Sequence, residues 1–116
     1  MSKLQIFSMK PQQLTLENGN VVYIRRLSAG ERLEWFDYLD TLRDEGEQKI
    51  TLALSLKNQL KLLALALGDE NGNRTFLDTE IDSLANIDSK TVDYLAHEIM
   101  VINGMISEAT DEAKKK

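Results

Sequence analysis

The sequence predicts a mainly α protein, a small helical domain of three to four helices with a short N-terminal β-hairpin. Three observations lead to this prediction. The chain has 116 residues, the size of one compact domain. Its only proline is Pro11, so helices can run long after it. The apolar residues beyond Gly30 recur mainly at spacings of three and four, which is the period of an α-helix.

Residues 14–27 are expected to form the hairpin. Two β-prone runs, residues 14–16 and 21–24, flank Asn18-Gly19, a pair that favours a tight turn with positive φ. A two-residue turn and a three-residue bulged turn are both compatible with this pattern, so the register stays open. The bulged turn would gather four apolar side chains on one face: Leu14, Leu16, Val22 and Ile24. Because a lone hairpin is marginal in water, this face is expected to pack on the helices or on a neighbouring subunit.

The first helix is expected to open at Ser28. Ser28-Ala29-Gly30-Glu31 matches the capping box, in which a hydroxyl and a carboxylate three residues apart satisfy free backbone N–H groups. Apolar residues follow at spacings of three, with Trp35 and Tyr38 beside them, at Leu33, Phe36, Leu39 and Leu42. Acids take the other side, at Glu31, Glu34, Asp37 and Asp40. We therefore expect an amphipathic helix that ends near Asp44-Glu45-Gly46.

The second helix is expected to run from about Gln48 to Leu67, with Gly68 as its C′ residue. Its predicted core stripe is Ala53, Leu56, Leu60, Leu63 and Leu67. A turn-rich loop and a short extended piece then lead to a brief helix capped by Asp78 or Thr79. Asp88 is the predicted N-cap of the last long helix, whose core positions are Val92, Leu95, Ile99, Ile102 and Ile106.

Two segments, residues 60–67 and 99–106, are apolar on more than one side. Either they pack on each other at the centre, or another protein covers one of them. We expect Leu60, Leu63, Ile99, Ile102 and Ile106 to build the core. The candidates for an outer surface that binds a partner or a second copy are Leu62, Leu65, Val101 and Met105. Arg25 and Arg26 join this candidate surface, because they are expected to pair with the acidic helices within the chain or across a subunit boundary.

Composition argues against several classes of function. The chain has no cysteine and a single histidine, His97, which leaves little for catalysis or metal binding. Its net charge of −5 disfavours contact with nucleic acid. The longest apolar run, residues 62–67, is too short to span a membrane, and residues 1–8 lack the apolar run of a secretory signal. We therefore expect no enzyme, no cofactor, no nucleic acid and no membrane partner.

The loop after the second helix imitates a calcium-binding EF-hand loop. Asp69, Asn71, Asn73 and Glu80 fall at ligand positions. The position that requires glycine holds Arg74 instead, so the segment is predicted to be an Asx-rich turn and not a calcium site.

Several features follow one another in a recognisable order. The hairpin closes in residues 22–28, Val-Tyr-Ile-Arg-Arg-Leu-Ser, and a capped helix and a long Leu/Ala helix come next. Residues 67–76 then match the pattern "aliphatic, x, Asp, x, x, Gly, x, x, x, Phe", and a closing helix carries Ile102-Asn103-Gly104 before a charged tail. Over nearly the whole chain, this order resembles that of the tail assembly chaperones of long-tailed bacteriophages.

The resemblance implies a non-catalytic protein of the bacterial host cytoplasm that is absent from the mature virion. It implies self-association into a ring or spiral homo-oligomer. The implied partners are the tape-measure protein, which the chaperone keeps soluble, and the tail-tube protein that later polymerises around it. Members of the family often have a second product made by ribosomal frameshifting, and the A-rich lysine codons expected behind Ala113-Lys114-Lys115-Lys116 are compatible with this.

Two other functions stay open at this point: a structural tail or connector component of the virion, and a generic helical protein-binding adaptor. In each case we expect residues 1–116 to form a single domain. Its parts would be the hairpin at 14–27, a helical body at 29–107 and a flexible tail at 108–116.

Overall fold

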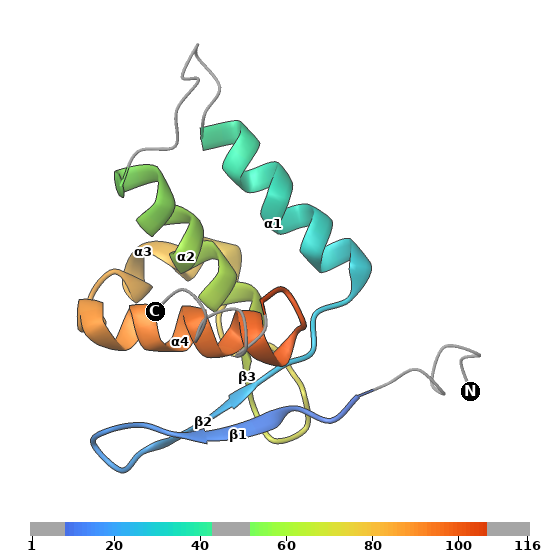
Figure 1. Ribbon diagram of the computed structural model, residues 1–116, viewed down its shortest axis with the longest axis vertical. Coiled ribbons are helices and arrows are strands. Elements are labelled where there is room, and N and C mark those ends of the chain that lie inside the picture. The colour runs from blue at the N-terminus through green and yellow to red at the C-terminus, as the bar shows by residue number, and fades with distance from the viewer. Residues whose placement is uncertain (1–8, 43–51, 107–116) are drawn as a thin grey trace, which may run out of the picture.

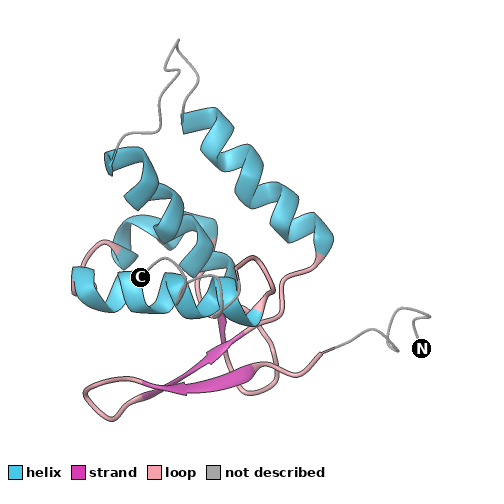
Figure 2. Cartoon of the chain, viewed as in Figure 1, coloured by secondary structure: helices cyan, strands magenta, loops and turns pink. Residues whose placement is uncertain are grey.

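The structure of the chain is a computed structural model that describes residues 9–42 and 52–106. In chain order these residues form β1 (Gln12–Thr15), β2 (Val21–Ile24), α1 (Ala29–Leu42), α2 (Leu52–Ala66), β3 (Leu67–Gly68), the 3₁₀ turn η2 (Asp78–Glu80), α3 (Ile81–Leu84) and α4 (Ser89–Ile102). The helices make up most of the fold, and the small sheet lies at one end of them (Figures 1 and 2). The prediction of a mainly α fold with an N-terminal hairpin is confirmed. The predicted tail at 108–116 and the predicted helix boundaries at 44–46 and 48 lie outside the described residues.

The hairpin adopts the three-residue bulged turn, one of the two registers that the sequence left open. Leu14 pairs with Val22. The backbone N–H of Gly19 donates to the carbonyl of Leu16 at 2.9 Å, and Gly19 has a φ of 88°, which glycine adopts without strain. The apolar face of the hairpin packs on the helical core, and Ile24 is fully buried there.

A third strand, β3, was not predicted. Instead of ending at a C′ residue, α2 runs directly into Leu67–Gly68, which pairs antiparallel with β2 and gives the sheet order β1-β2-β3. The prediction for Gly68 was therefore wrong. A Cβ at Gly68 would lie 2.6 Å from Cγ of Arg25 and 2.7 Å from the carbonyl oxygen of Asn73, so this glycine is required by close packing.

The last helix, α4, ends earlier than its apolar run. Gly104 has a φ of 72°, and its N–H donates to the carbonyl of Val101 at 3.0 Å. The N–H of Met105 donates to the carbonyl of Met100 at 2.8 Å, which completes a Schellman motif. The C′ glycine is thus Gly104. Ile106 lies beyond the helix and is half-buried, so its assignment to the core was wrong.

The helix starts agree with two of the three predicted caps. The N–H of Glu31 donates to Oγ of Ser28 at 3.1 Å and the N–H of Ser28 donates to Oε1 of Glu31 at 3.0 Å, which confirms the capping box. Asp88 caps α4 by accepting from the N–H of Thr91 at 3.2 Å. The brief helix is not capped by Asp78 or Thr79. At the start of η2 the Glu80 side chain accepts from the N–H of Leu77 at 3.0 Å. The Asp78 carboxylate instead forms ion pairs, which are described below.

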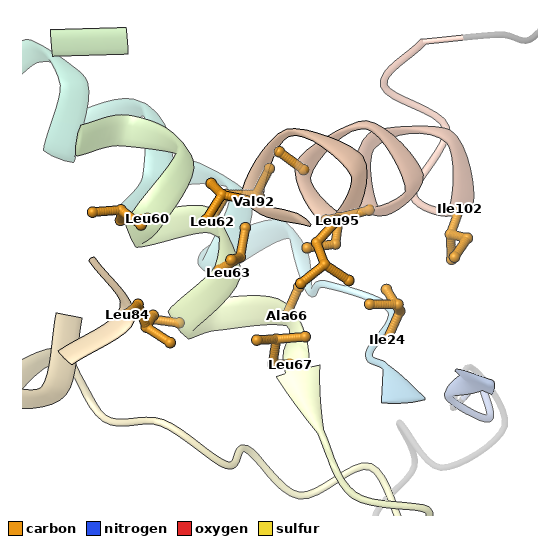
Figure 3. Packing of buried hydrophobic residues seen from close by; sticks show 13 residues of the cluster. Ile24, Leu60, Leu62, Leu63, Ala66, Leu67, Leu84, Val92, Leu95 and Ile102 are labelled. Atoms are coloured by element: carbon orange, nitrogen blue, oxygen red, sulfur yellow. The ribbon is translucent and has the colours of Figure 1, made fainter. Parts of the chain in front are cut away.

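The core forms where α2 crosses α4, with Ile24 contributed by β2 (Figure 3). The two apolar segments therefore pack on each other, the first of the two alternatives. The side chains of Leu62 and Leu65 are fully buried, so their placement on an outer surface was wrong. The reason is that α2 lies between α1, α3 and α4, which leave this part of the helix without an exposed side.

Candidate protein-interaction surfaces

The outer side of α1 carries an exposed apolar pair. Leu33 and Phe36 were expected to face the core, yet they are 61% and 48% exposed, so that expectation was wrong. At about 100° per residue, a row with a constant spacing of three rotates by about 60° at every step. Its first members therefore face away from the side on which Trp35 packs. We call Leu33 and Phe36 the α1 ridge.

The opposite side of α1 is fixed to α2. Nε1 of Trp35 donates to the carbonyl of Asn58 at 2.8 Å, and the Trp35 ring packs against the hydrophobic core. With its inner side thus occupied, α1 presents the ridge outward. A shallow hollow of about 500 Å³ adjoins the ridge and is lined in addition by Leu27, Ser28, Ala29 and Arg32.

A groove lies between the hairpin and the first two turns of α4. Its apolar lining comes from the sheet, from the 76–87 segment and from α4, at Leu16, Val22, Leu67, Phe76, Ile87 and Leu95. It has a volume of about 600 Å³. A second hollow of about 390 Å³ shares Leu16, Glu17 and Thr91 with it and adds Lys90 and Tyr94. We call the two together the hairpin–α4 groove.

Arg25 holds the sheet to the helices. Its Nη1 lies 3.0 Å from Oε2 of Glu31 and also donates to the carbonyl of Leu65, while its Nε donates to the carbonyl of Gly72 at 2.9 Å. Burial disfavours the Glu31 carboxylate, but the N–H of Ser28 and the Arg25 guanidinium outweigh this effect and lower the pKa of Glu31. Arg25 therefore pairs with an acidic helix of its own chain, which was one of the two predicted alternatives; the other was pairing across a subunit boundary. It is bound internally, and it is not a free surface charge.

Asn103 creates a junction between the end of α4, where Val101 and Met105 lie two residues to either side of it, and the segment that contains Arg26. Oδ1 of Asn103 accepts from the N–H of Leu27 at 2.7 Å, and its Nδ2 donates to the carbonyl of Arg25 at 3.3 Å. These bonds place the segment 25–27 against the end of α4. Arg26 is exposed, and Val101 and Met105 are half-buried. Of the candidate surface residues predicted from sequence, these three remain accessible.

Lys61 is a buried cation that the sequence analysis missed. Its side chain is only 5% exposed, and Nζ lies 2.7 Å from Oε2 of Glu34 and 2.8 Å from Oδ1 of Asp78. Arg74 also binds Asp78, at 2.6 Å. A single lysine inside the apolar run 60–67 was the signal that a buried partner exists. Glu34 and Asp78 thereby join α1, α2 and the segment that leads to α3.

The charges of this network reinforce one another. Burial opposes the charged form of Lys61, but the hydrogen bonds and charges of Asp78 and Glu34 outweigh burial and raise the pKa of Lys61. Hydrogen bonds from Lys61 and Arg74 lower the pKa of Asp78. Two of the four acids on α1, Glu31 and Glu34, thus bind cations of the same chain, Arg25 and Lys61.

The loop that imitates a calcium site is an Asx turn, as predicted. Oδ1 of Asp69 accepts from the N–H groups of Asn71 and Asn73, each at 2.9 Å. The N–H of Gly72 donates to the carbonyl of Asp69 at 3.0 Å. The Asp69 carboxylate therefore organises its own loop. Within residues 9–42 and 52–106, no group of three or more His, Cys, Asp or Glu side chains is arranged to hold a metal ion.

His97 is half-buried on α4 and lines none of the three hollows described above. In the part of the chain that the structure describes, no helix combines the length and the hydrophobicity needed to cross a bilayer. The described residues offer apolar contact surfaces, and among these residues alone we identify no constellation of acid, base and nucleophile.

The fold is found in a known protein. The chain is similar to the solved structure of the bacteriophage HK97 tail assembly chaperone, with a TM-score of 0.60 and 17% sequence identity over 86% of this chain and 89% of that chain. The resemblance to tail assembly chaperones is thereby confirmed at the level of the fold. No protein-family model matches the sequence. A search of curated proteins likewise finds no match.

Proposed function

We propose that the chain, which has the fold of the HK97 tail assembly chaperone, is itself a non-catalytic chaperone of bacteriophage tail assembly. The observation that carries this proposal is the extent of the shared fold, which covers almost nine-tenths of both chains. In this role the chain binds the tape-measure protein and keeps it soluble until the tail-tube protein polymerises around it. It also binds further copies of itself and does not remain in the mature virion.

The accessible residues around Asn103 are the proposed contact for the tape-measure protein. Val101 and Met105 supply partly exposed apolar surface at the end of α4, and the exposed Arg26 lies in the segment 25–27 that Asn103 binds. An amphipathic helix with acidic flanks suits such a surface, because its apolar side covers the two hydrophobic residues and its acids meet the arginine. Leu62, Leu65 and Arg25 take no direct part, since they are engaged inside the chain.

The experiment is co-expression with the tape-measure protein encoded in the same genome, followed by measurement of the soluble fraction of that protein. We expect the chain to raise the soluble fraction. The double variant Val101→Glu, Met105→Glu is expected to lose most of the gain. Leu56→Glu is the matched control, because Leu56 is 45% exposed on α2 and lies outside the proposed contact. An unchanged soluble fraction with the wild-type chain would exclude the chaperone function.

Mass spectrometry of purified particles separates the chaperone from a structural tail or connector component. The chaperone is expected in lysates of infected cells and not in finished particles. Its presence in particles at the copy number of tail proteins would instead make it a virion component. A chain that neither occurs in particles nor affects the tape-measure protein would be a generic adaptor.

The same lysates test for a frameshifted product. We expect a minor, longer protein that shares the N-terminal peptides of this chain. Sequencing the gene at the codons of Lys114, Lys115 and Lys116 and beyond is expected to show a slippery run of adenines. An interrupted run without an overlapping open frame would rule out the longer product and leave the chaperone function in place.

A further inference from the structure

We propose that the chain associates head-to-tail, with the α1 ridge of one copy seated in the hairpin–α4 groove of the next. This inference rests on the self-association that forms part of the proposed function, and it names the two surfaces that bring the copies together. The ridge adjoins the Asn103 junction assigned above to the tape-measure protein, because Arg32 beside it donates to the Asn103 carbonyl, whereas the groove contains none of the residues of that junction.

The two surfaces are positioned for a repeating contact. The groove lies beside the hairpin turn and the first turns of α4, at the lower left of Figure 1, whereas α1 lies at the opposite side of the molecule. A chain therefore cannot fill its own groove with its own ridge. Because the two contacting surfaces differ, each copy that joins leaves one ridge and one groove free at the ends.

Shape and polarity match between ridge and groove. The ridge offers two outward-facing apolar side chains, Leu33 and Phe36. The groove offers an apolar lining between sheet and helix, with the half-exposed Tyr94 at its rim. A contact that removes the apolar side chains of the ridge and the apolar lining of the groove from water is favoured by the hydrophobic effect. Small proteins seldom leave two such apolar surfaces exposed.

The flanking charges match in one orientation. At about 100° per residue, Phe36 and Leu33 lie between Arg32 and Asp37 around α1. Nη2 of Arg32 donates to the carbonyl of Asn103 at 2.6 Å, which fixes the guanidinium on its side of the ridge.

The groove carries two acids and one base. Glu17 and Asp88 line its larger hollow, and Lys90 and Glu17 line the adjoining one. Seating the ridge with Arg32 next to Asp88 brings Asp37 next to Lys90, and the reverse orientation opposes like charges. Both halves of this pattern belong to one chain, which is why we assign the groove to a second copy.

The first test compares two glutamate substitutions by sedimentation velocity over a range of concentrations. Leu33→Glu is expected to weaken self-association at least about tenfold. Leu77→Glu is the matched control, because Leu77 is 59% exposed and lies outside both surfaces, and it is expected to associate like the wild type. Circular dichroism checks that both variants are folded. Wild-type chain that stays monomeric at about 0.1 mM would overturn the inference.

The second test reverses the charges. Lys90→Glu and Asp37→Lys are each expected to weaken association several-fold, and the double variant is expected to recover most of it. Lys57→Glu, at an exposed position on α2, is the control for the change in net charge. Additive losses in the double variant would contradict the proposed pairing of Asp37 with Lys90.

The third test mixes two variants that each retain one surface. Leu33→Glu disrupts the ridge and keeps the groove, whereas Tyr94→Glu disrupts the groove and keeps the ridge. The ridge of the Tyr94→Glu variant can therefore bind the groove of the Leu33→Glu variant, and the mixture is expected to form a heterodimer that adds no further copies. Absence of that heterodimer would overturn the head-to-tail arrangement.

Failure of this inference is distinguishable from failure of the chaperone function. If Leu33→Glu associates like the wild type but no longer solubilises the tape-measure protein, the ridge binds that partner and the inference is wrong. If the wild-type chain associates through ridge and groove but never solubilises the tape-measure protein, the inference stands and the proposed function fails.

Discussion

At the scale of single residues, Gly68 shows how one missing side chain permits the fold. The Arg25 side chain crosses over it to reach Glu31 and the end of α2, and the carbonyl of Asn73 approaches from the other side. The space that a Cβ would occupy is already filled on both sides. The junction between sheet and helices therefore depends on this glycine, although its backbone conformation is ordinary.

Substituting Gly68 by alanine is expected to destabilise the chain by about 2 kcal/mol or more, because the Cβ displaces Arg25 and the Asn73 carbonyl. The matched control is Gly30→Ala in α1, where the nearest atom, Oγ of Ser28, lies 3.8 Å from the added Cβ. There alanine is expected to stabilise by about 0.5–1 kcal/mol, since it is the better helix former. Urea denaturation of both variants measures the difference, and equal effects would contradict the steric explanation.

At the scale of elements, the end of α4 and the link between β2 and α1 form one unit. The Asn103 side chain satisfies the N–H of Leu27 and the carbonyl of Arg25, and its backbone carbonyl accepts from Arg32. Gly104 then turns the chain away after the Schellman motif. The short Ile102-Asn103-Gly104 segment thus ends a helix and holds another helix in place.

Replacing Asn103 by alanine is expected to cost about 1–3 kcal/mol, because the N–H of Leu27 loses its acceptor in a partly buried position. Asn103→Asp keeps an acceptor for Leu27, but it places a carboxylate oxygen against the carbonyls of Arg25 and Ile99 at the C-terminus of a helix, so a loss of similar size is expected. Thermal denaturation followed by circular dichroism ranks the two variants. An unchanged melting temperature in Asn103→Ala would show that the bonds of the Asn103 side chain contribute little.

At the scale of the whole molecule, buried and half-buried ion pairs connect elements that are distant in the sequence. Lys61 links α2 to α1 through Glu34 and to the 74–78 segment through Asp78, and Arg25 links the sheet to α1 through Glu31. The stability of the assembled fold therefore depends on pH at both ends of the range.

The folded state holds the pKa of Asp78 and of Glu31 below their ordinary values. Their contribution is thus complete above the unfolded pKa of about 4 and is lost as pH falls through the folded values. The folded state raises the pKa of Lys61, so its contribution is complete below about pH 10 and is lost as pH rises through the folded value.

We expect Asp78→Asn to lower the melting temperature at pH 7 and to reduce the further loss between pH 5 and pH 3. Because Asp78 is half-exposed, the effect at pH 7 is expected to be about 1 kcal/mol or less. Asp93→Asn, at an exposed position on α4, serves as the control and is expected to follow the wild-type curve. Parallel acid curves for Asp78→Asn and the wild type would contradict the assigned role of Asp78.

Local patterns in the sequence determined most of the elements. The capping box of α1 and the N-cap of α4 depend on residues within three positions of each other, so they follow from the neighbouring residues alone. Asn18-Gly19 located the hairpin turn but left its register open. The order of the elements along the chain was also sufficient to indicate the fold that the HK97 chaperone shares.

Only the tertiary structure decided which sides of these elements are covered. Leu62 and Leu65 are buried because three helices surround α2, and Leu33 and Phe36 are exposed because Trp35 fixes the opposite side of α1 to α2. Gly68 is required because the side chain of Arg25, which is distant in the sequence, lies against it. Lys61 can be buried because Asp78, which belongs to another element, binds its ammonium group. Such contacts depend on packing between distant segments, and the periodicity of one segment carries no information about its neighbours in space.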